Sequence, residues 1–235
     1  NPNHSSIIRY QQKRRNFPMN GFIAVKPNCS IQSYLIVINA LIQSGFTVSK
    51  VQVSTLQAIS GAGLKGLKSK RLKKNVIPFI LGEEEKTINE PLKILGSVSK
   101  NGIKKNLNIN FSATCTRVPV IDGHTAIVQI SFKNDIPSLN KIKQILTKYN
   151  SPLKTMGLPM SPKHPIVYLK EENRPQPRLD SNLGNGMSVS IGRLSKDKFF
   201  DIRFIGLSNN IIRGAAGGAI QMAELLIKQG YIDVK

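Results

Sequence analysis

The alternation of apolar and polar positions predicts several strands. From Thr47 to Leu56, β-branched residues alternate with polar ones, so that Val51 and Val53 face one way while Lys50 and Gln52 face the other. This period of two is typical of a strand with one buried face. Shorter apolar runs predict further strands over 21–25, 107–120, 125–132, 166–169, 188–193 and 199–207.

Longer apolar segments predict helices between these strands. The apolar run 30–44 is closed by Gly45, and Asn28 just before it is a suitable N-cap. Further helices are predicted over 5–14, 137–149 and 211–229, the last packed tightly through its small residues at 215–219. Another is predicted over 83–95, where the acidic residues of the first turn suit the helix dipole. We therefore expect an α+β fold, with a mixed, largely antiparallel sheet packed with helices.

The dipeptide Asp122-Gly123 predicts a hairpin between the strands 107–120 and 125–132. In a two-residue turn Ile121 pairs with His124, and the period of two then places Arg117 on the face that His124 shares. A guanidinium suits a carboxylate or a phosphate, and an imidazole exchanges protons near neutral pH. The alternative is a surface arginine and a structural turn histidine.

Composition narrows the class of protein. The 235 residues allow one large or two small domains, and the net charge of +21 favours an anionic partner. Aromatic residues make up only 6% and no base-stacking motif is present, so we do not expect nucleic acid to be the main partner. No apolar run has transmembrane length and the polar segment 1–20 is no signal peptide, so we expect a cytoplasmic protein without a membrane partner.

The chain has only two cysteines, which excludes a disulfide framework and a four-cysteine metal site, and no other metal signature is present. Cys29 stands in Pro27-Asn28-Cys29-Ser30 at the head of the predicted helix 30–44. The partial positive charge of a helix N-terminus stabilises a thiolate, which predicts a nucleophile. The alternative is a buried, inert cysteine. Cys115 is predicted to lie in the core.

Two polar segments each allow two interpretations. Residues 61–66 match G-x-G-x-x-G, but no amphipathic helix follows, so a turn whose backbone approaches a ligand is favoured over a dinucleotide site. The basic residues that follow, 64–75, are predicted to be mobile. Glu83 and Lys86 are neighbours on the predicted helix 83–95, either as a solvated charged turn or as part of a site.

Taken together, five motifs resemble one family. They are Pro27-Asn28-Cys29-Ser30, the segment 55–63 (TLQAISGAG), the segment 82–86 (GEEEK), the segment 115–125 with Arg117 and Gly123-His124-Thr125, and the segment 210–219 (NIIRGAAGGA). In this order they resemble the archaeal and fungal branch of the aspartate-semialdehyde dehydrogenases, over nearly the whole chain.

The resemblance implies a role for each matching residue. It implies that Cys29 is the nucleophile that forms a thioacyl-enzyme, His124 the acid/base and Gln57 the residue that orients the substrate. Arg117 would bind the substrate carboxylate, Glu83 its amino group and Lys86 its phosphate. Asn210, Ser60 and Gly61 would contact the nicotinamide end of NADP. The implied reaction reduces 4-phospho-L-aspartate with NADPH, in lysine, threonine and methionine biosynthesis, and the implied assembly is a homodimer or homotetramer.

The resemblance also implies a domain layout. Residues 1–26 would be the end of an NADP-binding domain, 27–207 a catalytic and dimerisation domain, and 208–235 a C-terminal helix that packs on the NADP-binding domain. We expect the chain to start after most of the cofactor-binding Rossmann domain, as a fragment or a processed product. Departures from the family pattern are Lys26, Ile31-Gln32 and the lysine-rich stretch 64–75.

Two rival functions remain. A malonyl-CoA reductase is similar in scaffold, and Glu83 discriminates because only an amino substrate needs an acidic partner there. A basic binding module held by its charge would instead show salt-dependent affinity for RNA and no reactivity at Cys29.

Overall fold

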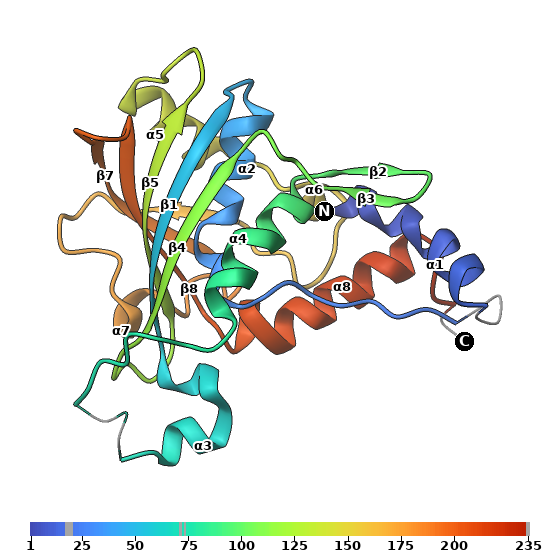
Figure 1. Ribbon diagram of the computed structural model, residues 1–235, viewed down its shortest axis with the longest axis horizontal. Coiled ribbons are helices and arrows are strands. Elements are labelled where there is room, and N and C mark those ends of the chain that lie inside the picture. The colour runs from blue at the N-terminus through green and yellow to red at the C-terminus, as the bar shows by residue number, and fades with distance from the viewer. Residues whose placement is uncertain (17–20, 71, 73, 234–235) are drawn as a thin grey trace.

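The computed structural model describes residues 1–16, 21–70, 72 and 74–233, which form an α+β fold around a six-stranded sheet (Figure 1). The strand order is β4 (Asn110–Arg117), β1 (Val48–Gln57), β5 (His124–Phe132), β8 (Ile202–Ser208), β7 (Val189–Lys196) and β6 (Ile166–Tyr168). The pairs β1–β4 and β6–β7 are parallel, and the other three pairs are antiparallel. The predicted class of a mixed, largely antiparallel sheet is confirmed.

The main core lies between one face of the sheet and two helices, α2 (Leu35–Gln43) and α5 (Leu139–Lys148). Along β1, Val51 and Val53 are buried in this core, as their alternation predicts, because every second side chain points to the same face. The opposite face stays partly exposed through residues such as Gln52, Ser54, Ile127, Gln129 and Arg203.

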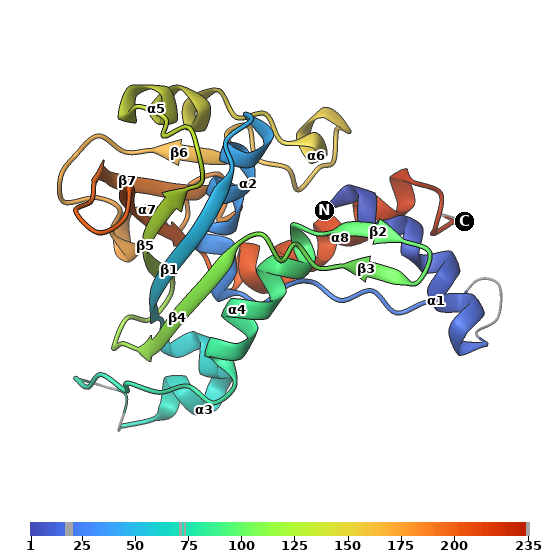
Figure 2. The ribbon, with the colours of Figure 1, turned by 45° about the horizontal axis from the view of Figure 1, so that its top comes forward.

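The remaining elements surround the sheet. The helices are η1 (Pro2–Ser6), α1 (Ile7–Arg15), η2 (Ser30–Ser33), η3 (Ile59–Ala62), α3 (Gly63–Lys68), α4 (Glu83–Ile94), α6 (Pro152–Thr155), α7 (Pro177–Asp180), the π-helix η4 (Ile212–Ala216) and α8 (Gly217–Lys228). The strands β2 (Ser97–Ser99) and β3 (Gly102–Lys104) form a separate hairpin. Both views place α1, α8 and this hairpin together at one end of the molecule (Figures 1 and 2). Gln229 Nε2 donates to Pro2 O at 3.2 Å, so the first and last described helices meet there.

The predicted hairpin at Asp122-Gly123 is wrong, because β1 lies between β4 and β5. β4 runs parallel to β1 and β5 runs antiparallel to it, so the segment 118–123 passes across the end of β1. Gln57 at the end of β1 pairs with Arg117, and Leu56 pairs with Thr125. Arg117 and His124 therefore meet at the end of β1, although they do not pair with each other through a turn.

Three local predictions also change. The segment 21–25 forms no strand, and its Val25 side chain is 80% exposed. The predicted helix 30–44 is interrupted at Tyr34, whose φ of −140° separates η2 from α2. In the C-terminal helix, Gly214 and Gly217 are buried while Ala215, Ala216 and Ala219 are not, so the tight packing involves the glycines.

The basic stretch 64–75 is described only in part. Its first residues belong to α3, while Arg71 and Lys73 lie outside the described residues. Within the part of the chain that the structure describes, no helix combines the length and apolar character needed to cross a membrane.

Candidate active site

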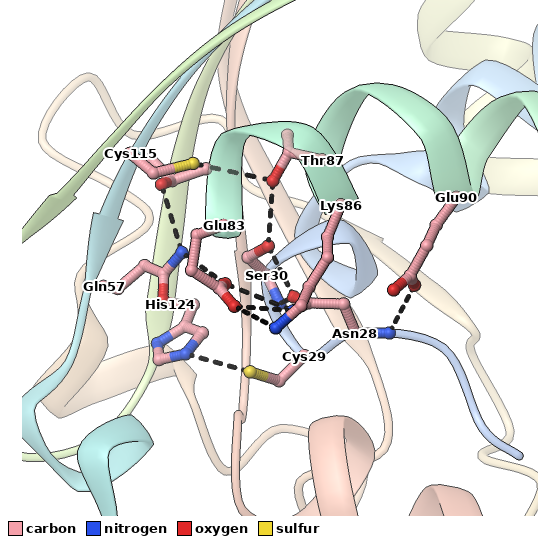
Figure 3. A network of polar contacts seen from close by, with 11 residues as sticks. Asn28, Cys29, Ser30, Gln57, Glu83, Lys86, Thr87, Glu90, Cys115 and His124 are labelled. Carbon is pink, nitrogen blue, oxygen red and sulfur yellow. Dashed lines mark hydrogen bonds and ion pairs between the residues drawn. The ribbon is translucent and has the colours of Figure 1, made fainter. Parts of the chain in front are cut away.

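The thiol of Cys29 lies against the imidazole of His124, with 3.3 Å between Sγ and Nε2 (Figure 3). Cys29 immediately precedes the short helix η2, and His124 is the first residue of β5. The turn around the thiol is held by Asn28, whose Oδ1 accepts from Ser30 N at 2.8 Å and from Ser30 Oγ at 2.7 Å. Two segments 95 residues apart in sequence thus form one cysteine–histidine pair.

The hydrogen bond at Nδ1 determines which tautomer His124 adopts. The backbone N–H of Ala58 donates to His124 Nδ1 at 3.0 Å, so Nδ1 is an acceptor and the neutral ring carries its proton on Nε2. Complete burial, together with the nearby Arg117 cation, lowers the pKa of His124 to about 3. The imidazole is therefore neutral at physiological pH and directs an N–H group at the sulfur.

Arg117 and Gly61 enclose the other side of this pair. Arg117 is buried, and its Nη1 donates to Ala58 O at 2.8 Å. A Cβ on Gly61 would lie 2.7 Å from Arg117 Nη1 and 2.9 Å from His124 Cε1, so only glycine lets the 60–61 turn approach so closely. The guanidinium and the imidazole thus lie side by side against the 60–61 turn.

Glu83, at the start of α4, accepts hydrogen bonds from three neighbouring side chains. Its Oε1 accepts from Asn28 Nδ2 at 3.0 Å and from Lys86 Nζ at 3.2 Å, and its Oε2 accepts from Gln57 Nε2 at 3.1 Å. Glu83 is 9% exposed and Gln57 only 1%, whereas the Lys86 side chain is 52% exposed. Lys86 therefore forms the solvent side of the cluster, and Glu83 is its buried centre.

The resting thiol is not activated in the way that a helix N-terminus predicts. Burial and the neighbouring Glu83 carboxylate raise the pKa of Cys29, and the opposing effects of Lys26, the local backbone and Arg117 are smaller. The helix that begins here is a single four-residue 3₁₀ turn, which carries little of the dipole that a long helix would supply. The thiol is therefore protonated at rest, with the Nε2–H of His124 beside it.

The residues that the resemblance assigns to the nicotinamide end of NADP lie next to Arg117 and His124. Asn210 Nδ2 donates to Ser60 Oγ at 2.9 Å, and Asn210 Oδ1 accepts from Gly123 N at 2.8 Å. Asn210 is 4% exposed, so its amide links the 60–61 turn to the residue before His124. Because Gly61 has no Cβ, the turn that carries Ser60 lies directly against the Arg117 guanidinium and the His124 imidazole.

The nine residues singled out from the sequence thus lie together: Cys29, Gln57, Ser60, Gly61, Glu83, Lys86, Arg117, His124 and Asn210. The sequence did not reveal the bond between Asn28 and Glu83, nor the contact of Gly214 with the thiol residue. A Cβ on Gly214 would come 2.8 Å from Cys29 Cβ, so η4 packs directly on the cysteine. The small residues from 214 onward were the available signal for that close approach.

The second cysteine behaves as predicted. Cys115 is fully buried, and its Sγ lies 3.5 Å from Thr87 Oγ1. Among the described residues, no group of three histidine, cysteine, aspartate or glutamate side chains is arranged to hold a metal ion.

A cysteine beside a histidine at the end of a sheet strand is an arrangement typical of enzymes that use a thiol nucleophile. The family model of the semialdehyde dehydrogenase dimerisation domain matches residues 38–213, so the chain belongs to this family. The resemblance to aspartate-semialdehyde dehydrogenases is thereby confirmed.

Individual relatives agree with this assignment. An aspartate-semialdehyde dehydrogenase of Archaeoglobus fulgidus is 42% identical over 99% of this chain and 65% of its own length. The crystal structure of the Candida albicans aspartate-semialdehyde dehydrogenase with NADP superimposes with a TM-score of 0.86 at 34% identity, over 99% of this chain and 66% of that one. A malonyl-CoA reductase (NADP) of Metallosphaera sedula is 36% identical over 99% of this chain and 65% of its own. The chain thus spans about 65% of the length of these curated relatives.

Proposed function

We propose that this chain carries the catalytic part of an NADP-dependent aspartate-semialdehyde dehydrogenase. The proposed reaction converts 4-phospho-L-aspartate and NADPH into L-aspartate 4-semialdehyde, phosphate and NADP. The observation that carries the proposal is the 3.3 Å contact of Cys29 Sγ with His124 Nε2, with the buried side chains of Arg117 and Glu83 nearby.

In the first step, the Cys29 sulfur attacks the acyl carbon of 4-phospho-L-aspartate. A C–S bond forms, the C–O bond to the phosphate breaks, and the phosphate leaves with the electron pair, which leaves a thioester on the enzyme. Because Nε2 of His124 already carries a proton, the thiol proton passes to water or to the departing phosphate. The Nε2–H then donates to the charge that develops on sulfur and on the carbonyl oxygen.

Three charged side chains position the substrate. The buried Arg117 guanidinium binds the α-carboxylate in a forked geometry, and the Glu83 carboxylate binds the α-ammonium group. Lys86, the most exposed of the three, binds the phosphate at the mouth of the pocket. Gln57, held by Glu83, orients the acyl group toward the thiol.

Asn210, Ser60 and Gly61 would hold the nicotinamide end of NADP over this pocket. When bound, NADPH supplies the hydride that reduces the thioester. The Nε2–H of His124 donates a hydrogen bond to the oxyanion of the reduced intermediate. The oxyanion re-forms the carbonyl as the C–S bond breaks, so the aldehyde leaves and Cys29 is released as a thiolate.

The domain layout is part of this proposal. Residues 27–207 form the catalytic and dimerisation domain, while 1–26 and 208–235 belong with the NADP-binding domain; the bond between Gln229 and Pro2 supports this, because it joins those two ends. We propose a homodimer formed through the partly exposed face of the sheet, which carries Ile127. The cytoplasm, where thiols stay reduced, is the proposed compartment.

A malonyl-CoA reductase is the second candidate, because a relative with that name is 36% identical over almost the whole chain. The malonyl group carries no α-ammonium group. The nearly buried Glu83 at the centre of the pocket therefore favours the amino substrate.

A single-turnover experiment without cofactor tests the proposal and separates the candidates. The chain is mixed with 4-phospho-L-aspartate or with malonyl-CoA, and the acylated residue is located by peptide mass spectrometry. We expect an adduct on Cys29, with one phosphate released per chain, from the phosphorylated substrate only. An adduct from malonyl-CoA alone would support the second candidate, and the absence of any adduct on Cys29 would contradict both.

A further inference from the structure

One face of α4 carries a row of polar side chains that point at the segment around Cys29 (Figure 3). They are Glu83, Lys86, Thr87 and Glu90, at the i, i+3, i+4 and i+7 positions that share one side of a helix. The proposed reaction uses the first two. Thr87 contacts Ser30, with 3.4 Å between their hydroxyl oxygens, and Glu90 has no part in that reaction.

Glu90 contacts the backbone next to the nucleophile. Its Oε2 accepts from the N–H of Asn28 at 2.7 Å, a short charge-assisted bond directly before Cys29. The side chain of Asn28 is held separately, by Glu83 on one side and by Ser30 on the other. Glu90 thus fixes the main chain of a residue whose side chain is already part of the pocket.

Upstream of this loop the chain is held at Ile23, whose N–H and C=O both bond the side chain of Gln11 at 2.9 Å. Residues 21–28 form neither helix nor strand, and the side chains of Ile23 and Val25 are 55% and 80% exposed. A segment with so few buried contacts samples many conformations unless specific hydrogen bonds restrict it. The bond from Asn28 to Glu90 is a restraint directly beside the thiol residue on this upstream side.

Glu90 also acts on the charge beside the thiol. Lys26 is half-buried, and burial lowers its pKa, while the nearby Cys29 and Glu90 raise it. Lys26 in turn acts to lower the pKa of Cys29. Glu90 thereby helps to keep a cation next to the nucleophile, in addition to holding the backbone.

We propose that Glu90 is a positioning residue that holds Asn28 and Cys29 in the geometry for attack. Its carboxylate binds the backbone of Asn28 rather than the thiol or the imidazole, so its effect passes through the loop. The inference rests on the proposed function of Cys29 as the nucleophile. It predicts that loss of the carboxylate slows acylation without weakening substrate binding.

The test compares three variants of the chain in the cofactor-free acylation by 4-phospho-L-aspartate. Glu90→Ala removes the acceptor, Glu90→Gln keeps an oxygen in its place, and Glu85→Ala is the matched control, because Glu85 is an exposed glutamate of the same helix. We expect Glu90→Ala to lower the limiting acylation rate by about tenfold, with the half-saturating substrate concentration unchanged. Glu90→Gln should restore most of the rate, and Glu85→Ala should match the unmodified chain.

The outcomes separate this inference from the proposed function. If the unmodified chain forms no adduct on Cys29, the nucleophile assignment fails and this inference fails with it. If the unmodified chain is acylated and Glu90→Ala is acylated equally fast, only the positioning role is overturned. A rate in Glu90→Gln as low as in Glu90→Ala would also overturn it, because the acceptor oxygen would then be irrelevant.

Discussion

The two cysteines of the chain lie at different places in one polar network, and only one of them has the surroundings of a nucleophile. Cys115 points into the core and contacts Thr87, with no exposed surface. Cys29 keeps partial exposure and faces the Nε2–H of His124 at 3.3 Å. Burial is the largest influence on both thiols and raises the pKa of each. The resting pKa therefore does not distinguish them; access and the histidine partner do.

The largest expected effect follows from removing one thiol or the other. Cys29→Ala should lower acylation by 4-phospho-L-aspartate by at least about 1,000-fold, because no other group can form the thioester. Cys115→Ala should stay within about threefold, since its thiol is fully buried against Thr87. The rate of phosphate release measures both. Comparable losses in the two variants would mean that the difference between the thiols has no functional meaning.

The next effect concerns Arg117, which lies two residues beyond Cys115 on the same buried face of β4. Arg117→Leu should raise the half-saturating concentration of 4-phospho-L-aspartate by about 100-fold, because a buried charged contact to the carboxylate is lost. The limiting rate should change less. Arg9→Leu, on the exposed side of α1, is the control. An unchanged half-saturating concentration with a reduced limiting rate would count against the carboxylate role.

A smaller effect should follow from Thr87→Val. This change removes the hydroxyl that lies between Ser30, the neighbour of Cys29, and Cys115. Thr87 Oγ1 is within 3.4 Å of Ser30 Oγ and 3.5 Å of Cys115 Sγ, and its residue is fully buried. Loss of these contacts at constant shape should destabilise the fold by about 1 kcal/mol, measured by urea unfolding. Acylation at Cys29 should change little, because Asn28 still holds Ser30. A large loss of acylation would show that the two environments are coupled.

The smallest effect is a pH dependence of stability. Burial raises the pKa of Cys115 above its ordinary value of 9.0, so the folded state retains the thiol proton more strongly than the unfolded state does. This stabilisation is fully present below pH 9.0 and is lost as the pH rises from there through the raised pKa of the folded state. Between about pH 8 and pH 10, the urea midpoint of Cys115→Ala should therefore fall less steeply than that of the unmodified chain. If the urea midpoints of both proteins fell equally steeply with pH, the raised pKa of Cys115 would be contradicted.

The hairpin prediction placed two site residues together for a wrong reason. The period of two and the dipeptide Asp122-Gly123 place Arg117 and His124 on one face of a two-stranded unit. The structure inserts β1 between the two strands, and the residues meet at the end of that third strand instead. A strand's local sequence determines which side chains share a face, but it does not determine which distant strand becomes its neighbour.

The hydrogen-bond donors around Glu83 and His124 could not be predicted from the sequence either. The Nδ1 atom of His124 accepts from a backbone amide, at Ala58, which carries no signal in its side chain. The bond between Asn28 and Glu83 joins residues 55 apart, through a loop and a helix that have no local relation. In contrast, the spacing of Glu83 and Lys86 correctly placed two neighbours on one helix turn, because that geometry is local.

By itself, the sequence determined the strands with clear periodicity, such as β1, and the helix α4 through the acidic residues of its first turn. It also determined that Cys29 stands at the head of a helical turn. These features depend on backbone geometry within a few residues, so the pattern of side chains is enough to predict them. Only the tertiary structure decided the strand order, the tautomer of His124 and the raised pKa of Cys29. Each of these depends on burial and on partners far away in the chain, which become neighbours only when the whole sheet has assembled.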